Sequence, residues 1–321
     1  MTETIRTQVR NLLMIPVYWF DSWQPKKPNP WQDPDKVDWI QGVPFIAMHL
    51  MVFGIFWTGI SWPAIAVCLA LYGIRMFAIT GLYHRYFSHR TFKTSRFMQF
   101  VFGLVGASAV QRGPLWWAAH HRRHHRLSDQ QGDVHSPIIN SFLWSHMGWF
   151  LAPVNAKTDL KAVNDLAKFP ELCLLDRFDL VVPIALGTFT YFLGVGLNAL
   201  WPDLGTSGMQ MLVVGFFLST VLVSHGTYTI NSLAHRWGSR RYETGDFSRN
   251  NFTLALITFG EGWHNNHHFY PASTRQGFYW WEIDISYYIL KAMSWVGLIW
   301  DLRPVPSHVR ESRPQQEAVA V

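Results

Sequence analysis

Long apolar stretches alternate with charged stretches along this chain, and their lengths predict helices that cross a membrane. From Trp39 to Ile74 the sequence contains no Asp, Glu, Lys or Arg. That run is long enough for two helices that each cross a hydrocarbon layer of about 30 Å. The tripeptide SWP at 61–63 predicts the break between them, because Pro63 suits the first turn of a new helix.

Two further apolar stretches, Leu180 to Pro202 and Leu204 to Ile230, flank the turn WPDLG. We therefore predict an all-α integral membrane fold with four transmembrane helices in two hairpins, beneath a cytoplasmic helical cap. The four predicted spans are 43–60, 63–80, 180–200 and 208–230.

The basic residues predict the side of the membrane on which each segment lies. Lys and Arg accumulate in short loops on the cytoplasmic side. The two far-side turns, SWP and LWPDLGTS, contain neither residue. We expect a multi-pass protein with both termini, the connecting region 85–178 and the active site in the cytoplasm.

Composition favours a membrane protein over a soluble one. Charged residues make up 15% of the chain, against about 25% in soluble domains, and the net charge is +6. We interpret that charge as attraction to anionic membrane lipid, with no nucleic-acid partner. We expect one domain over 1–321, with a cytoplasmic N-terminal segment 1–39, a core 40–304 and a disordered polar tail 305–321.

Eight histidines gather in three short clusters. The clusters are HRYFSH with His84 and His89, HRRHH with His121, His124 and His125, and HNNHH with His264, His267 and His268. Residues three and four apart share one face of a helix, so each H-x-x-H-H should aim three rings in nearly one direction. The five-residue step in HRYFSH is about 140° around an α-helix. Its two rings should therefore meet only from the flanks of a site or where the helix ends.

These clusters predict a metal centre. Imidazoles packed beside Arg85 and the arginines of HRRHHR need an anionic or metal partner, and neutral imidazole binds Zn, Fe, Cu and Ni. Eight histidines without cysteine exceed the four ligands of a closed zinc site, so we predict two ions sharing the set. Because His84 and His264 each follow an apolar stretch, the centre should lie at the cytoplasmic membrane surface.

Other polar residues are candidates for the same centre. In NSLAH, Asn231 and His235 are four apart and should lie one above the other on a helix, but spacing alone leaves their role open. Asp129, Asp133 and Glu261 are candidates to accept a proton from the far nitrogen of a ligand imidazole. The alternative for these acids is a solvated surface position.

The motifs HRYFSH, HRRHH, NSLAH and EGWHNNHH, in this order and spacing, resemble the membrane-bound fatty acyl desaturases, in particular the delta-9, stearoyl-CoA desaturase-like branch. The resemblance runs from about Ile40 to about Pro304. It implies that nine histidines bind two Fe ions and that Asn231 approaches one of them through a water. The nine are His84, His89, His121, His124, His125, His235, His264, His267 and His268.

The resemblance also implies a reaction. With O2 as co-substrate and two electrons, two hydrogens leave a saturated acyl chain, giving a cis double bond for unsaturated fatty acid biosynthesis. An alkyl C–H has no acidic proton, so metal-based oxidation is needed in place of acid and base groups.

The acyl carrier and electron donor are less constrained. Animal acyl-CoA members have an Arg that helps hold CoA two residues before the second histidine motif, where this chain has Ala119. Acyl-CoA, lipid-linked and carrier-protein substrates all stay open. Because we find no cytochrome-b5-like segment, we expect a separate ferredoxin, rubredoxin or cytochrome b5-type donor on the basic cytoplasmic surface.

Helical phase predicts residues of a substrate tunnel. Counting back from His84, the same face carries Thr80, Met76 and either Tyr72 or Gly73. We predict that this face lines the deep end of the tunnel and that Tyr72 limits chain length. Trp117 reads first as part of an interfacial aromatic belt, and alternatively as part of the tunnel mouth.

Three other functions compete with desaturation. A related di-iron hydroxylase or ketolase would share the histidine motifs. A His-rich metal transporter or a haem electron carrier would belong to different classes. Transporters place coordinating groups near the bilayer midplane, whereas these clusters lie outside the apolar runs.

Overall fold

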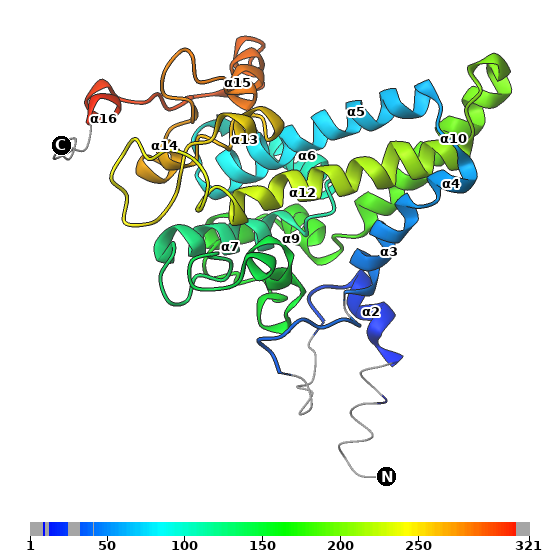
Figure 1. The fold of residues 1–321 in the computed structure, drawn as a ribbon, viewed down its shortest axis with the longest axis horizontal. Coiled ribbons are helices and arrows are strands. Elements are labelled where there is room, and N and C mark those ends of the chain that lie inside the picture. Colours follow the sequence, from blue (N-terminus) through cyan, green and yellow to red (C-terminus); the bar gives the residue numbers. More distant parts are fainter. Residues whose placement is uncertain (1–8, 10–12, 25–32, 41, 313–321) are drawn as a thin grey trace, which may run out of the picture. The chain divides into compact units, whose positions relative to one another are not determined.

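The structure is a computed structural model that describes residues 9, 13–24, 33–40 and 42–312. The described chain is mostly helical (Figure 1). It divides into two compact units, which we describe separately. Unit 1 comprises residues 1–75, 103–117 and 148–225, and unit 2 comprises residues 76–102, 118–147 and 226–321.

Among the described residues, three helices are long and apolar enough to cross a membrane. They are Trp62–Ser88, Val181–Leu200 and Gly208–Ser232. Their bounds agree with the last three predicted spans, except that the first of them continues to Ser88. The predicted span 43–60 is a pair of shorter helices, α3 (Val43–Val52) and α4 (Ile55–Thr58). A four-span topology therefore stays a prediction.

Unit 1 holds most of the apolar helices. Besides α3 and α4 it contains α2 (Ile15–Phe20), most of α5 (Trp62–Phe77), η3 (Trp149–Leu151), η4 (Pro153–Asn155), α8 (Asn164–Ala167), α9 (Pro170–Arg177), α10 (Val181–Leu200), η5 (Pro202–Leu204), α11 (Gly208–Gln210) and η6 (Met211–Leu218). The π-helical segment η6 packs against α10 and α3.

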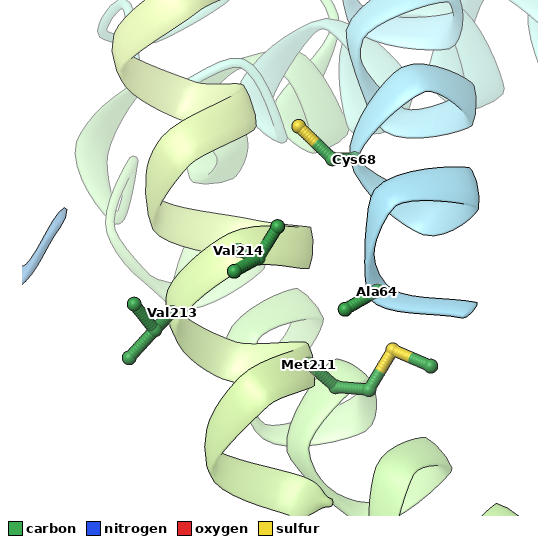
Figure 2. Close-up of a cluster of buried hydrophobic side chains, with 5 residues drawn as sticks. All are labelled: Ala64, Cys68, Met211, Val213 and Val214. Carbon is green, nitrogen blue, oxygen red and sulfur yellow. The ribbon is translucent and has the colours of Figure 1, made fainter. Parts of the chain in front are cut away.

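A small apolar core joins α5 to η6. Figure 2 shows Ala64 and Cys68 of α5 facing Met211 and Val214 of η6, and all four side chains are buried. Val213 belongs to the same cluster. This interdigitation holds two candidate membrane helices together through dispersion contacts, which are the main attraction between helices in lipid.

Two glycines allow α10 and α11 to approach closely. A Cβ on Gly194 would lie 2.5 Å from the carbonyl oxygen of Ser207, and one on Gly208 would lie 2.8 Å from the ring of Tyr191. Small residues permit such close backbone packing between apolar helices. The helix pair therefore depends on the missing side chains.

Arg75 adds a polar link inside unit 1. Its guanidinium is fully buried and donates to the backbone carbonyl of Leu71, 3.1 Å away, to Thr220 Oγ1, 2.6 Å away, and to Ser219 Oγ. A buried cation in an apolar helix is costly unless oxygens satisfy its donors. These contacts tie α5 to the helix Gly208–Ser232.

Unit 2 carries shorter helices and connecting loops. It contains η1 (Ala78–Ser88), parts of α6 (Arg96–Ala107), α7 (Pro114–Leu127) and α12 (Ser219–Ser232), most of η2 (Trp144–Gly148), and then α13 (Phe252–Ile257), α14 (His264–Phe269), α15 (Ile285–Trp295) and α16 (Ser307–Glu311). The described chain departs from all-α where β1 (Lys93–Thr94) pairs antiparallel with β2 (Ile299–Trp300), and at two isolated β-bridges that join Asn250 to Ser239 and Trp263. Helix α15 packs on η1.

The predicted disordered tail, 305–321, is only partly described. Ser307–Glu311 form α16, and the hydroxyls of Tyr242 and Tyr279 donate to the carbonyl of Arg310 over 2.8 and 3.0 Å. The structure therefore differs from the predicted disorder over this helix. Residues 313–321 lie outside the described residues.

The close contact at Gly194 can be tested against a neighbouring glycine of α10. We expect Gly194→Ala to lower the free energy of unfolding by about 1–3 kcal/mol, because the added methyl group overpacks the helix pair. Gly196→Ala should be neutral or slightly stabilising, because a Cβ there meets nothing within 4 Å and Ala favours helix. Thermal unfolding in detergent, followed by intrinsic fluorescence, measures both. Equal midpoints for the two variants would contradict the packing described.

Candidate metal centre

Four segments of unit 2 supply the clustered histidines. The first motif lies at the end of η1, the second on α7 and the third on α14, while His235 lies just past the end of α12. All nine histidines belong to the same compact unit. The structure thus brings together residues that lie up to 184 positions apart in sequence, from His84 to His268.

A π-helix brings His84 and His89 together. The backbone amide of His89 donates to the carbonyl of His84 over 3.2 Å, and their ring centroids lie 4.9 Å apart. This i→i+5 bonding of a π-helix places residues five apart one turn above each other. The predicted separation of about 140° is wrong here because it assumed α-helical geometry.

The histidines form two groups. In each group, every member offers a nitrogen that lies within 4.8 Å of those of the other members. Group A consists of His84, His89, His121, His125 and His267, and group B consists of His124, His235, His264 and His268. Facing Nε2 atoms are 2.8 Å apart between His89 and His121 in group A and 3.0 Å apart between His235 and His264 in group B.

Each H-x-x-H-H motif divides between the two groups, contrary to the prediction that it aims three rings one way. On α7, His121 and His125 join group A while His124 joins group B. On α14, the first and last histidines join group B, and the middle one, His267, joins group A. Residues i and i+4 are about 40° apart on a helix, whereas i+3 lies about 60° to the other side. The motif therefore spans two adjacent sites.

The pair in NSLAH is arranged differently from the prediction. Helix α12 ends at Ser232, so His235 lies in the following turn and not one helical turn above Asn231. The carbonyl of Asn231 accepts a hydrogen bond from Ser145 Oγ, 2.9 Å away. A water-mediated approach of Asn231 to a metal stays a prediction.

Carboxylates hold the far nitrogens of several rings, which confirms the prediction for three acids. Each pair joins a carboxylate oxygen to the Nδ1 atom of an imidazole. The pairs are His124 with Asp133 at 2.9 Å, His235 with Asp129 at 2.7 Å, and His84 with Glu261. Such a contact fixes the tautomer, so that the Nε2 lone pair faces the centre of the group.

A fourth carboxylate, Asp246, was missed by the sequence analysis. Its Oδ2 lies 2.6 Å from Nδ1 of His268, and its Oδ1 accepts from Ser248 Oγ over 2.5 Å and from Thr244 Oγ1 over 2.8 Å. Asp246 stands in a polar loop with no motif around it. The only signal is an acid beside Gly and Ser, which is also typical of an ordinary turn.

Most of the imidazoles are held in the neutral state that a metal requires, whereas at His124 the neighbouring Asp133 outweighs the effect of burial and raises the pKa. Burial, reinforced by neighbouring imidazoles, holds the pKa of five of them well below the usual range: His89, His121, His125, His264 and His267. Neutral rings keep a lone pair for an ion. Nε2 of His268 is buried and has no hydrogen-bond partner among the described residues. The donor set therefore fits metal ions of the Fe, Zn or Cu type.

Arg85 connects the first motif to the loops behind it. Its side chain is 1% exposed and contacts Asp284 at 2.9 Å, the carbonyl of Thr274 at 2.9 Å and Glu261 at 3.2 Å. Gly260 stands at φ +119°, and a Cβ there would lie 2.4 Å from Asp284. No sequence pattern predicted this buried network, which positions the carboxylate that contacts His84.

The predicted tunnel residues fall into both units. Met76 and Thr80 are buried in unit 2, where Thr80 Oγ1 lies 2.9 Å from the carbonyl of Met76 and 2.5 Å from Ser286 Oγ. Tyr72 and Trp117 belong to unit 1 and are partly buried. Their role in a tunnel stays a prediction.

Comparison with known proteins decides the family. A profile for "Fatty acid desaturase" matches residues 60–296, a range that includes all nine histidines. The chain belongs to the fatty acid desaturase family. It is therefore an acyl desaturase, an oxidoreductase of lipid metabolism, as the motifs predicted. Members of this family depend on metal, and groups A and B are the histidine clusters of this desaturase that could bind it.

The desaturase is similar to curated proteins with several specificities. It is 36% identical over 259 residues to an acyl-CoA C20 Delta5-desaturase of Anemone leveillei, covering 79% of this chain and 78% of that protein. It is 34% identical over 266 residues to an sn-1 stearoyl-lipid 9-desaturase of Anabaena variabilis, covering 82% and 93%. It is 35% identical over 259 residues to Delta-9 acyl-lipid desaturase 1 of Arabidopsis thaliana, covering 79% of each.

The Arg85 network predicts a large loss of stability. We expect Arg85→Met to lower the free energy of unfolding by about 3–5 kcal/mol, because two buried carboxylates lose their cation. Lys93→Met is the matched control, since the Lys93–Asp301 ion pair lies on the surface of the same unit. Thermal unfolding of both variants measures the difference. A stable Arg85→Met protein would mean that the network contributes little.

Proposed function

We propose that this desaturase uses two Fe ions and O2 to introduce a cis double bond at the delta-9 position of a saturated acyl chain, for unsaturated fatty acid biosynthesis. The observation that carries the proposal is the convergence of nine imidazoles into two adjacent groups. In the proposal, group A holds one ion and group B the other, with Asn231 approaching one of them through a water.

The chemistry of the donors supports metal-based oxidation. The two groups offer only nitrogen donors to the ions, and the resemblance to desaturases selects iron among the metals that such donors suit. Bound iron, with O2, supplies the oxidation that acid and base groups cannot perform on an alkyl chain. This chain's residues hold the ions, fix the ring tautomers and keep water out. Asp129, Asp133, Asp246 and Glu261 orient four of the rings.

The proposals for the delta-9 position and for the acyl carrier are supported by the named relatives. Two of the relatives described above are named as 9-desaturases of lipid-linked chains, and one as an acyl-CoA enzyme. Ala119, where animal acyl-CoA members have an Arg, is 3% exposed on α7 and carries no charge with which to hold a CoA phosphate. The proposed substrate is therefore a lipid-linked or CoA-linked acyl chain, with electrons from a separate ferredoxin, rubredoxin or cytochrome b5-type protein.

The membrane arrangement is part of the proposal. Three helices are long and apolar enough to span, and the apolar helical stretch Val43–Thr58 would supply the fourth span. This stretch measures about 24 Å along its axis, somewhat short of the hydrocarbon layer. We propose a desaturase core over 40–304, preceded by the segment 1–39, with both termini and the histidine groups on the cytoplasmic side.

Expression in a host that lacks unsaturated fatty acids tests the reaction. We expect mass spectrometry to locate a new cis double bond at carbon 9. His267→Ala should lower product formation about 100-fold or more, because the loss of a ligand exceeds the effect of losing a partner behind it. His308→Ala is the matched control, since His308 lies on α16 outside both groups.

Two outcomes of that experiment, and one absorption spectrum of the purified protein, would contradict the proposal. A product with an added oxygen would indicate a hydroxylase or ketolase. Full activity of His267→Ala would remove group A from the reaction. A Soret band in the purified protein would indicate haem.

The predicted tunnel can be tested through product chain length. If Tyr72 closes the deep end, Tyr72→Ala should shift products toward longer acyl chains, because the ring no longer occupies the path. Ile74→Ala is the matched control on the same helix, since Ile74 is 53% exposed. Gas chromatography of cell lipids measures the profile. An unchanged profile for Tyr72→Ala would exclude it as the limit.

A further inference from the structure

The two histidine groups differ in the carboxylates behind them. In group B, three of the four imidazoles contact an aspartate through Nδ1. The pairs are His124 with Asp133 at 2.9 Å, His235 with Asp129 at 2.7 Å and His268 with Asp246 at 2.6 Å. Three carboxylates therefore lie directly behind the rings of group B, on the side of the Nδ1 atoms.

Neutral groups provide the other hydrogen bonds of these aspartates. Asp129 accepts from Ser136 Oγ at 2.5 Å and from the backbone amide of Phe247 at 2.8 Å. Asp133 accepts from the backbone amide of Asp129 at 3.0 Å. These bonds order the carboxylates without cancelling their charge.

Asp246 is ordered in the same way. Its Oδ1 accepts from the amide of Ser248 at 3.0 Å, in addition to the two hydroxyls described above. Among the described residues, no Lys or Arg forms an ion pair with Asp129, Asp133 or Asp246. Arg240 reaches only the backbone carbonyl of Asp246.

An arginine compensates part of the negative charge behind group A. Glu261 contacts both Nδ1 of His84 and the guanidinium of Arg85, which also pairs with Asp284. Two acids against one cation leave one negative charge behind group A in this network. The three aspartates behind group B have no Lys or Arg partner among the described residues, so three negative charges remain there.

We propose that the two metal positions are unequal, with group B binding its ion more tightly and stabilising the higher charge state, and that Asp246 is a positioning residue of this tighter site. This inference rests on the proposed function, since it requires two ions.

Two physical effects act in the same direction. A carboxylate behind an imidazole raises the donor strength of the ring and fixes its orientation. Negative charge within a few ångströms also stabilises a trivalent ion more than a divalent one, and the effect is strong where the surroundings exclude water. At group A, Arg85 opposes the charge effect, because its guanidinium lies 3.2 Å from the second oxygen of Glu261 and compensates the negative charge there.

Iron release to a chelator tests the inequality without measuring activity. The purified full-length protein is loaded with 57Fe and exposed to an excess of a ferrous chelator under reducing conditions. We expect wild-type protein to release its iron in two phases of equal amplitude, the faster from group A. Mössbauer spectra taken between the phases should retain one of two quadrupole doublets.

Variants assign the phases. Asp246→Asn keeps the shape of the side chain but removes its charge, and should speed the slow phase about 10–100-fold while leaving the fast phase unchanged. Asp246→Glu, which keeps the charge, should restore much of the slow phase. Glu261→Gln is the matched control at group A and should affect only the fast phase.

The fast phase also serves as a folding control for Asp246→Asn. If Asp246→Asn binds no iron and shows neither release phase, the variant Asp129→Asn takes its place in the test. It removes a negative charge behind the same group B from a different loop. The inference would be overturned if Asp246→Asn left the slow phase unchanged. It would also be overturned if neither Asp246→Asn nor Asp129→Asn accelerated the slow phase without accelerating the fast phase.

The same measurement separates this inference from the proposed function. Wild-type protein with two irons that leave at one common rate would overturn the inequality alone. Wild-type protein that never holds two irons would overturn the proposed function as well.

Discussion

Nine imidazoles held close together constrain the rest of unit 2. In four pairs the facing Nε2 atoms lie 2.8–3.0 Å apart, and only one member of such a pair can donate a proton to the other. Burial holds the pKa of most of these rings low, so protonation does not relieve the crowding of lone pairs. Bound cations would relieve it, and the architecture of the unit is consistent with that requirement.

The surrounding residues prepare the rings for this arrangement. The π-helical end of η1 aligns the two histidines of the first motif, and the divided H-x-x-H-H motifs let α7 and α14 each serve both groups. Four carboxylates fix the tautomers of four rings from behind. The nitrogen donors that could bind metal are thus distributed over several elements, while the buried Arg85 network anchors one of those carboxylates.

Sequence patterns predicted much of this site because ligand types and apolar runs are local properties. The histidine motifs, the contacts of Asp129, Asp133 and Glu261, and three long apolar helices could all be predicted from spacing, hydropathy or family resemblance. The π-helix could not, because no residue in HRYFSH distinguishes i→i+4 from i→i+5 bonding. The role of Asp246 could not be predicted either. It depends on how the loop that carries Asp246 folds back onto α14, and no local sequence pattern indicates that path.

The proposed function requires that each histidine group hold one iron ion. Anomalous diffraction from crystals of the iron-loaded protein, measured on both sides of the iron absorption edge, tests it most directly. We expect two separate iron peaks, one surrounded by the five imidazoles of group A and one by the four of group B. A single peak, or a peak bound mainly by oxygen or sulfur ligands, would contradict it.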